Sequence, residues 1–270
     1  MYYYGIVIII GRVNVGKSTI LNKCIKKKLS ITSHKICTTK TNIIGIYNNT
    51  NYQILFIDTP GINNKNISNI SKQYNIINNV DIILLVINNY WTKYEELILN
   101  YLKKLDKLIL LVINKIDFFK QKSDLLPYLS FLDKKYSFSN IIPICARKSS
   151  NINMLLEIIR NYIPVGKPKF PNYIITNQSH KFILSELIRE KIIKFLNKEL
   201  PYTTKVKVIY TNELKNTYNI FAIIYVKNNN QKKIIIGNGG FLIKKINFYA
   251  TKDIEIFINK KVNLILSIKI

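Results

Sequence analysis

Cysteine and long apolar runs are both scarce in this sequence, and each shortage excludes a class of protein. The three cysteines, Cys24, Cys37 and Cys145, have no spacing typical of a metal site or a disulfide framework, which fits a reducing cytosol. Apolar runs such as Ile82–Ile87 are far shorter than the ~18 residues that predict a membrane span. The first residues lack the basic region and cleavage site of a signal peptide, so we predict none.

Acidic residues are scarce too. The chain has 15 Asp and Glu against 41 Lys and Arg, a formal net charge of +26. Such an excess favours a polyanionic partner, most simply nucleic acid. Codon bias is a second explanation, because Ile, Asn and Lys are abundant and share A/T-rich codons, whereas only four residues are arginine. A membrane surface is a third candidate partner, supported by charge alone.

Length and hydropathy leave room for two domains, since 48% of the 270 residues are apolar. Over residues 1–163, short β-branched runs alternate with longer mixed segments, which predicts a doubly wound α/β domain. Three prolines and a glycine between Pro164 and Pro171 predict a linker at 164–174. Within residues 1–163 we predict strands at Tyr3–Ile10, Asn42–Tyr47, Tyr52–Asp58, Asp81–Ile87, Lys107–Asn114 and Ile141–Ile144, with helices at Ser18–Lys26, Tyr94–Leu105 and Asn151–Tyr162, the last capped by Asn151.

A glycine-rich segment follows the first predicted strand. Gly11–Ser18 matches G-x-x-x-x-G-K-[ST] between a strand and a helix, where backbone N–H groups can face phosphate oxygens. Lys17 can then reach the β- and γ-phosphates, and the Ser18 hydroxyl can ligate Mg²⁺. Asp58 ends another strand and can hold Mg²⁺ through water, while the Gly61 N–H can touch the γ-phosphate. These residues predict a nucleotide triphosphate site.

Two further motifs end later strands and indicate the base. Asn114–Asp117 reads NKID, in which Asp117 can accept hydrogen bonds from guanine N1 and N2 while Asn114 and the Lys115 stem frame the ring. Cys145–Arg147 ends the next strand, where a backbone N–H can meet guanine O6. Ligands of α/β sheets bind at the carboxyl ends of the strands, so the motifs together predict GTP rather than ATP.

The segment Cys37–Thr41 lies between the first helix and the second strand, where a threonine can ligate Mg²⁺ only when a γ-phosphate is present. Spacing alone leaves Thr38 and Thr39 as alternatives. Ile62 follows Gly61 where a glutamine could orient water, so hydrolysis needs another group, a bound cation or a partner. We expect His34 to be solvated.

Residues 175–270 are predicted to form a smaller α+β domain of the type II KH arrangement, in which a G-x-x-G loop clamps a nucleic-acid backbone. Its predicted order is a helix, two strands, Gly237–Gly240 after an apolar strand end, a helical segment and a last strand. A plain glycine-rich turn is the alternative. The residues predicted to bind RNA are Lys232, Lys233, Gly237, Asn238, Gly239, Gly240, Lys244 and Lys245, with Ile236, Ile243 and Ile246 forming an apolar groove for unstacked bases. The predicted elements are a helix at Ser179–Asn197 and strands at Lys205–Tyr210, Ile220–Val226 and Val262–Ile268.

The order of these motifs, and several strings of residues, resemble the Era family of GTPases over essentially the whole chain. The resemblance implies a GTPase that binds the 3′ end of 16S rRNA through its KH domain and assists maturation of the 30S subunit. The matching strings are Gly11–Leu21, Ile31–Ser33, Thr38–Thr39, Asp58–Gly61, Asp124–Pro127, Ser185–Lys191, Glu199–Tyr202 and Gln231–Gly240.

The resemblance also implies roles for single residues. Thr39 would be the magnesium threonine, Asn14 would help to hold K⁺, and Lys17, Thr39 and Gly61 would act in catalysis. An apolar residue at Ile62 is normal for the family. With the motifs above, the predicted site for GTP, GDP and Mg²⁺ comprises Gly11, Asn14, Val15, Gly16, Lys17, Ser18, Thr19, Asp58, Thr59, Pro60, Gly61, Asn114, Lys115, Asp117, Cys145 and Ala146, with Ser18, Thr39 and Asp58 on the magnesium.

Four features depart from the family pattern: Val13 replaces a usual proline, Cys145 a usual serine and Gly239 a common lysine, and no helix or tail follows the last strand before Ile270. RNA selectivity is therefore expected to differ. The alternative function is a GTP-binding RNA chaperone with negligible intrinsic hydrolysis. A related GTPase of tRNA modification would need cysteine or cofactor machinery after residue 165, which the sequence lacks. We expect a cytoplasmic monomer, with peripheral contact at the inner membrane left open.

Overall fold

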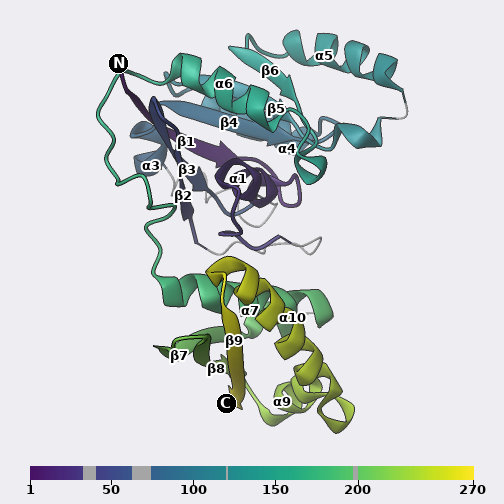
Figure 1. Ribbon diagram of the computed structural model, residues 1–270. Coiled ribbons are helices and arrows are strands. Elements are labelled where there is room, and N and C mark those ends of the chain that lie inside the picture. The colour runs from purple at the N-terminus through teal and green to yellow at the C-terminus, as the bar shows by residue number, and fades with distance from the viewer. Residues whose placement is uncertain (33–40, 63–73, 120, 197–199) are drawn as a thin grey trace. The chain divides into compact units, whose positions relative to one another are not determined.

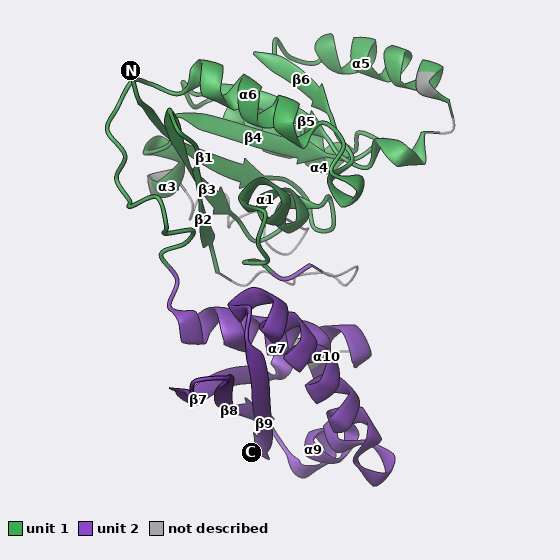
Figure 2. Cartoon of the chain, viewed as in Figure 1, with its two compact units in different colours: residues 1–30, 39–177 green, residues 31–38, 178–270 purple. Residues whose placement is uncertain are grey.

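The computed structural model describes all residues except 33–40, 63–73, 120 and 197–199 (Figure 1). The chain divides into two compact units, Met1–Ser30 with Thr39–Asn177 and Ile31–Thr38 with Gln178–Ile270 (Figure 2). The doubly wound α/β domain and the smaller α+β domain predicted from the sequence are both present, one in each unit. The segment 164–174, predicted as a linker, lies within the first unit.

The first unit is built on a six-stranded sheet in the order β2-β3-β1-β4-β5-β6. All neighbours are parallel except β2 and β3, which form an antiparallel hairpin. Central strands such as β4 are buried along their whole length, as apolar strands covered on both faces should be. The connection after β1 leads to β2 and β3 on one side, whereas the connection after β3 leads to β4 on the other side of β1. This reversal opens a crevice at the carboxyl ends of β1 and β3. The strands are β1 (Tyr3–Ile10), β2 (Ile43–Asn48), β3 (Tyr52–Asp58), β4 (Ile82–Ile87), β5 (Leu108–Ile113) and β6 (Asn140–Pro143).

The helices of this unit are α1 (Lys17–Ile25), α3 (Tyr74–Asn78), α4 (Lys93–Leu102), α5 (Leu125–Asp133) and α6 (Ile152–Tyr162). A capping box begins α4, because the Thr92 hydroxyl accepts from the Tyr94 N–H and Glu95 accepts from the Thr92 N–H. Asn151 is at the predicted N-cap position of α6, but its side chain does not cap the helix. Asn151 has a left-handed backbone (φ 62°), and its side chain donates to the Pro143 carbonyl instead of capping the helix.

The segment that follows α6 is held against the outer strands of the sheet. Gln53, which is fully buried, accepts from the Lys169 and Phe170 N–H groups at 2.9 and 3.1 Å and donates to the Phe170 carbonyl. Farther along, the Ile46 N–H donates to the Ile175 carbonyl at 2.8 Å. A composition rich in proline predicted a linker here, but these hydrogen bonds make the segment part of the first unit.

The second unit is a three-stranded sheet in the order β7-β8-β9, with β8 antiparallel to β7 and parallel to β9. The predicted strand end before Gly237 is wrong, because these residues form a helix that begins where the Asn228 side chain accepts from the Gln231 N–H. Only Ile235 of the three isoleucines before Gly237 is buried, so the apolar run reflects one helix face rather than a strand. The elements are α7 (His180–Phe195), α8 (Leu200–Thr203), β7 (Lys205–Glu213), β8 (Thr217–Tyr225), α9 (Asn229–Ile236), α10 (Phe241–Ile258) and β9 (Lys261–Lys269).

The buried amide of Gln53 provides a test of the contact between the sheet and the segment 164–177. Gln53→Ala leaves the Lys169 and Phe170 N–H groups without their acceptor, so we expect the free energy of unfolding to fall by about 2–4 kcal/mol. Urea unfolding of the full chain measures the loss. The exposed Thr50→Ala serves as control, and an equal effect of both changes would contradict this account.

Candidate functional site

The loop after β1 closes on itself through two residues in left-handed conformations. Gly16 has φ 102° and Asn14 has φ 63°. A Cβ at Gly16 would lie 2.2 Å from the Asn114 amide nitrogen, so only glycine fits there. The Asn114 Nδ2 donates to the Val15 carbonyl at 2.8 Å and so ties this loop to the end of β5.

Lys17 begins α1, and its side chain turns back into the loop. The ammonium donates to the Gly11 and Arg12 carbonyl oxygens at 2.9 and 2.7 Å, and the residue is only 5% exposed. A buried cation surrounded by loop backbone is well suited to an anionic group, because phosphate oxygens accept stronger hydrogen bonds from an ammonium than carbonyl oxygens do.

Asp58 ends β3 and is fully buried beside the first turn of α1. Its Oδ2 accepts from the Ser18 hydroxyl at 2.6 Å and from the Ser30 hydroxyl at 2.8 Å, whereas Oδ1 has no hydrogen-bond partner. Burial raises the pKa of Asp58, and the two hydroxyls and the nearby Lys17 only partly oppose this. The carboxylate and the Ser18 hydroxyl are hard oxygen donors of the kind that Mg²⁺ prefers.

Within the described part of the chain, no three His, Cys, Asp or Glu side chains gather into a metal cage. Mg²⁺ commonly takes one or two protein oxygens and completes its shell with water and phosphate. The pair of Ser18 and Asp58 fits a magnesium ion that completes its shell with the phosphates of a nucleotide.

The segment after Asp58 runs along the phosphate loop. Val13 N–H donates to the Ile62 carbonyl and Ile62 N–H donates to the Gly11 carbonyl, both at 3.2 Å. A Cβ on Gly61 would lie 2.6–2.9 Å from atoms of Val13, which explains the glycine. The side chain of Ile62 is buried in the core and therefore offers nothing to orient a water molecule.

The base-recognition motifs from two strands meet as predicted. Asn114 Oδ1 accepts from the Ala146 N–H at 3.0 Å, and the Lys115 ammonium donates to the Asn14 carbonyl at 2.7 Å. Asp117 accepts from the Cys145 thiol at 3.2 Å and from the Arg147 guanidinium at 3.0 Å. The hydrogen bond from Cys145, with lesser help from Arg147, lowers the pKa of Asp117, so this carboxylate is ionised and ready to accept hydrogen bonds.

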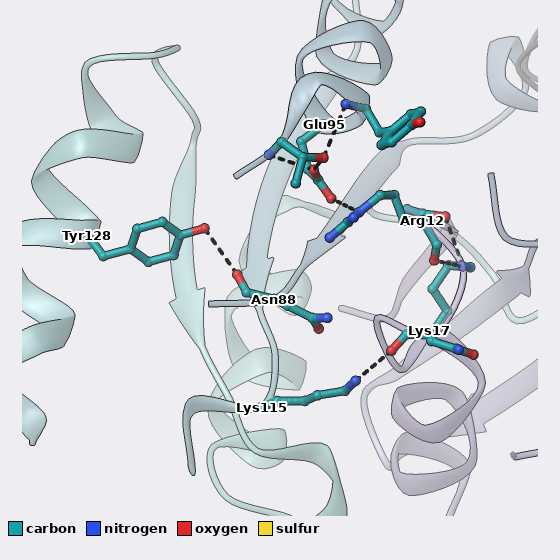
Figure 3. Close-up of polar contacts among 10 residues, drawn as sticks. Arg12, Lys17, Asn88, Glu95, Lys115 and Tyr128 are labelled. Carbon is teal, nitrogen blue, oxygen red and sulfur yellow. Dashed lines mark hydrogen bonds and ion pairs between the residues drawn. The ribbon is translucent and has the colours of Figure 1, made fainter. Parts of the chain in front are cut away.

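A cluster that the motifs did not reveal joins the phosphate loop to α4 (Figure 3). The Arg12 side chain forms an ion pair with Glu95, which is 1% exposed, and its guanidinium lies 5.0 Å from the centre of the Tyr90 ring. Nearby, the Tyr128 hydroxyl donates to the Asn88 carbonyl at 3.1 Å. The capping-box pattern of Thr92 and Glu95 was visible in the sequence, but nothing there joined Glu95 to Arg12.

In the second unit, the glycine loop connects α9 to α10. Gly237, Gly239 and Gly240 all have positive φ, and a Cβ on Gly237 would lie 2.8 Å from the Leu242 Cβ. Nothing lies within 4 Å of a Cβ placed on Gly239. The loop therefore exposes backbone at its tip, as a phosphate-binding loop requires.

A groove of about 620 Å³ lies between α10 and β9. Of the residues predicted to form an apolar groove, Ile243 lines it and Ile236 does not. Lys244 also lines it, and the Lys252 ammonium lies 4.3 Å from the centre of the half-exposed Phe248 ring. The prediction that Ile246 lines a base-binding groove is wrong, because its side chain is fully buried in the core. The sequence did not predict Phe248 as a groove residue, because the sequence pattern alone did not show which face of α10 carries its ring.

Not every predicted residue gathers at these sites. Lys245 lies over the Phe195 and Phe241 rings at 4.9 and 5.8 Å and does not line the groove, while Lys232 is half-buried and Lys233 exposed on α9. The predicted Thr39, its alternative Thr38, and also His34 and Cys37, lie outside the described residues.

Comparison with known proteins agrees with both units. Residues 6–115 match the family described as 50S ribosome-binding GTPase, and residues 185–270 match the KH domain family. The chain is 39% identical over 276 residues to GTPase Era of Haemophilus influenzae strain PittGG, a match that covers 99% of this chain and 91% of the relative. GTPase Era of Pasteurella multocida strain Pm70 is also 39% identical, over 99% of this chain and 90% of the relative.

Solved structures show the same likeness. A crystal structure of Era in complex with MgGDPNP and nucleotides 1506–1542 of 16S ribosomal RNA has a TM-score of 0.90 at 33% identity, and covers 100% of this chain and 94% of that one. A single-residue variant of Aquifex aeolicus Era bound to GDP·AlF4⁻ also gives a TM-score of 0.90 at 33% identity, over 99% and 93%. Among the described residues, no helix combines the length and apolar character needed to cross a membrane.

The buried Asp58 carboxylate predicts a pH-dependent stability. Since burial raises the pKa of Asp58 above its unfolded value, the unliganded fold loses stability as pH rises through the interval between the two values. Asp58→Asn removes that charge and keeps an acceptor for Ser18 and Ser30. We expect the variant to be more stable than the wild type at pH 7 by on the order of 1 kcal/mol, with a smaller difference at acidic pH.

Urea unfolding of both proteins without nucleotide or Mg²⁺, from pH 4 to pH 8, measures this difference. Asp106→Asn, which changes an exposed carboxylate, serves as the control and should not change the stability. A stability difference for position 58 that does not grow with pH would show that the carboxylate is not destabilised by burial.

Proposed function

Because the chain belongs to the Era family of GTPases, we propose that it is a GTP-hydrolysing assembly factor that binds the 3′ end of 16S rRNA and promotes maturation of the 30S subunit. The observation that carries the proposal is the presence, in one chain, of a guanine-reading carboxylate at Asp117 and a bare glycine loop at 237–240 beside a basic, aromatic groove. The first suits a guanine nucleotide and the second a single-stranded nucleic acid.

We propose that GTP takes over hydrogen bonds that the protein makes to itself. The Lys17 ammonium exchanges the Gly11 and Arg12 carbonyl oxygens for β- and γ-phosphate oxygens. Ser18 and Asp58 would hold the Mg²⁺, which would supply positive charge beside the phosphates. The binding set is the one predicted from the motifs: Gly11, Asn14, Val15, Gly16, Lys17, Ser18, Thr19, Asp58, Thr59, Pro60, Gly61, Asn114, Lys115, Asp117, Cys145 and Ala146.

Base recognition divides between a side chain and the backbone. Asp117 accepts hydrogen bonds from guanine N1 and N2, a pattern that adenine does not offer, and a backbone N–H of Cys145–Arg147 meets O6. The Ala146 N–H donates to Asn114 Oδ1 in the unliganded protein, so in this role it shares that bond with O6. The Lys115 stem, fixed through the Asn14 carbonyl, frames the ring. Discrimination against adenine follows because its N1 is an acceptor and would face the carboxylate without a proton.

Hydrolysis requires groups other than a glutamine after Gly61. The buried Ile62 side chain leaves water orientation to the backbone of this segment, to Thr39 and to a cation. We propose that Asn14 helps to hold K⁺ beside the phosphates, where it would supply positive charge to the transition state. Replacing K⁺ by Na⁺ then lowers the turnover of GTP without changing its affinity.

We propose that the glycine loop binds the sugar-phosphate backbone of the RNA and that the groove binds its bases. Lys232, Lys233, Lys244 and Lys245 supply charge on both sides of the loop, although only Lys244 lines the groove itself. The exposed Phe248 ring offers a face on which an unstacked base can lie. The 30S subunit as the partner and a monomeric state are parts of this proposal.

A first experiment separates the two activities. Gly239→Asp places a carboxylate in open space at the loop tip, and Gly239→Asn is the neutral variant of equal size; both residue types tolerate the backbone at φ 56°. We expect the aspartate variant to bind an RNA copy of nucleotides 1506–1542 at least tenfold more weakly, because the carboxylate repels phosphate, and the asparagine variant to bind it almost normally. Fluorescence anisotropy with labelled RNA measures both.

Reciprocal measurements complete the test. Lys17→Ala should lose GTP affinity by at least a hundredfold and keep RNA binding, whereas both variants at position 239 keep GTP turnover. RNA binding that is equally strong with aspartate and asparagine at position 239 would contradict the proposed loop contact. Tight GTP binding with no turnover in K⁺ or Na⁺, with or without RNA, would favour the chaperone alternative.

Arg147 generates a second prediction. Its guanidinium, 75% exposed, donates to Oδ2 of Asp117, so we propose that it competes with guanine for this carboxylate. Exposed ion pairs contribute ~0.2–1 kcal/mol, and we therefore expect Arg147→Ala to bind GDP about two- to fivefold more tightly at low salt, with the gain lost at high salt. Arg160→Ala, which removes an exposed arginine from α6, is the control for net charge. Weaker GDP binding by Arg147→Ala would show that the guanidinium assists the base instead.

A further inference from the structure

A basic hollow lies on the first unit, between the carboxyl end of α1 and the start of α6. It has a volume of about 470 Å³, and its lining includes Lys23, Lys26, Lys27 and Lys28. Ser149, which lies just before α6, and Asn153 in its first turn also line the hollow, and no acidic residue is among the described residues that line it. None of these six residues belongs to the proposed nucleotide site or to the glycine loop.

The backbone that carries the lysines is held in place. The Asn22 amide donates to the Ser30 carbonyl at 2.7 Å, and its Oδ1 accepts from the Leu29 and Ser30 N–H groups, both at 2.9 Å. These bonds close the turn that follows α1, so the lysine stems leave a fixed backbone. A concentration of positive charge on a rigid, concave surface favours an anionic ligand.

Lys26 has an unusual backbone for a lysine. It lies at the carboxyl end of α1 with φ 58°, a left-handed position at which glycine is preferred. Attraction to the helix dipole explains lysines near the carboxyl end of a helix. It does not explain a lysine at a left-handed position, where glycine is preferred because it has no side chain. A/T-rich codon usage raises the lysine content along the whole chain and does not select this position.

We propose that this hollow binds the phosphate backbone of RNA, as a contact separate from the glycine loop. The inference rests on the proposed function, since it assumes that the chain binds RNA. Lysines act as point charges on phosphates and carry no base recognition, so the contact adds affinity without sequence preference. A membrane surface fits less well, because the apolar residue of the lining, Ile152, is buried and provides no anchor.

Paired variants test the hollow against the general charge of the protein. The test variant is Lys23→Gln with Lys26→Gly, and the glycine suits the left-handed backbone, so the fold should be kept. The control is Lys104→Gln with Lys134→Gln, which removes the same charge from exposed positions outside the hollow. Thermal unfolding and GTP turnover verify that both proteins are intact.

The measurement is the affinity for the RNA copy of nucleotides 1506–1542 across a series of KCl concentrations. Each phosphate contact to a single strand contributes ~0.7 to the slope of log K against log salt. We expect the test variant to lose about 1.4 from this slope and to bind about tenfold more weakly at 0.15 M salt. The control should keep the wild-type slope. An equal loss in both variants would overturn the proposal in favour of a general charge effect.

Two further measurements show the reason if the test variant binds RNA normally. Vesicles containing phosphatidylserine are tested with the same proteins, and loss of vesicle binding with an unchanged RNA slope would assign the hollow to lipid and overturn the RNA proposal. Gly239→Asp is measured beside them. If it alone weakens RNA binding, the hollow is not an RNA site but the proposed function stands, and if neither variant weakens binding, the proposed function also fails.

Discussion

One buried amide, that of Asn114, holds the nucleotide site together. Its Nδ2 donates to the Val15 carbonyl of the phosphate loop, its Oδ1 accepts from the Ala146 N–H, and its own N–H donates to the Ile87 carbonyl at the end of β4. Three segments that are distant in sequence are therefore positioned by one residue that is 2% exposed. Each bond is buried, so breaking any of them would leave an unpaired polar group away from water. This cost opposes movement of the three segments and makes the arrangement rigid.

The groups around this amide are arranged for a ligand rather than for stability. Asp58 is buried with one oxygen unpaired, and Lys17 is buried among carbonyl oxygens of its own loop. Both arrangements are less favourable than an ion pair with an anion or a cation would be. We propose that a bound phosphate with Mg²⁺ gives Lys17 anionic oxygens in place of carbonyl oxygens, and gives the unpaired Oδ1 of Asp58 a cation.

The lysines that give the chain its positive charge lie in several different environments in the structure. Some lysines lie over aromatic rings, as Lys245 does over Phe195, and others line the groove beside β9 or the hollow beside α1. Codon bias explains why lysine is common, but it does not explain a lysine in a left-handed position such as Lys26. The distribution over surfaces, rather than the total of +26, is what can be connected to a polyanionic partner.

The sequence by itself determined the nucleotide motifs, their order at strand ends and the two fold classes, because buried parallel strands and glycine loops have strong local signatures. It did not determine where Asn151, Ile246 or the residues before Gly237 would lie. A local pattern cannot tell a buried strand from one face of a helix, or a cap from a side chain that bonds a distant carbonyl. Only the tertiary structure joined Arg12 to Glu95, Arg147 to Asp117 and the lysines after α1 to α6, because these contacts depend on the packing of elements far apart in the chain.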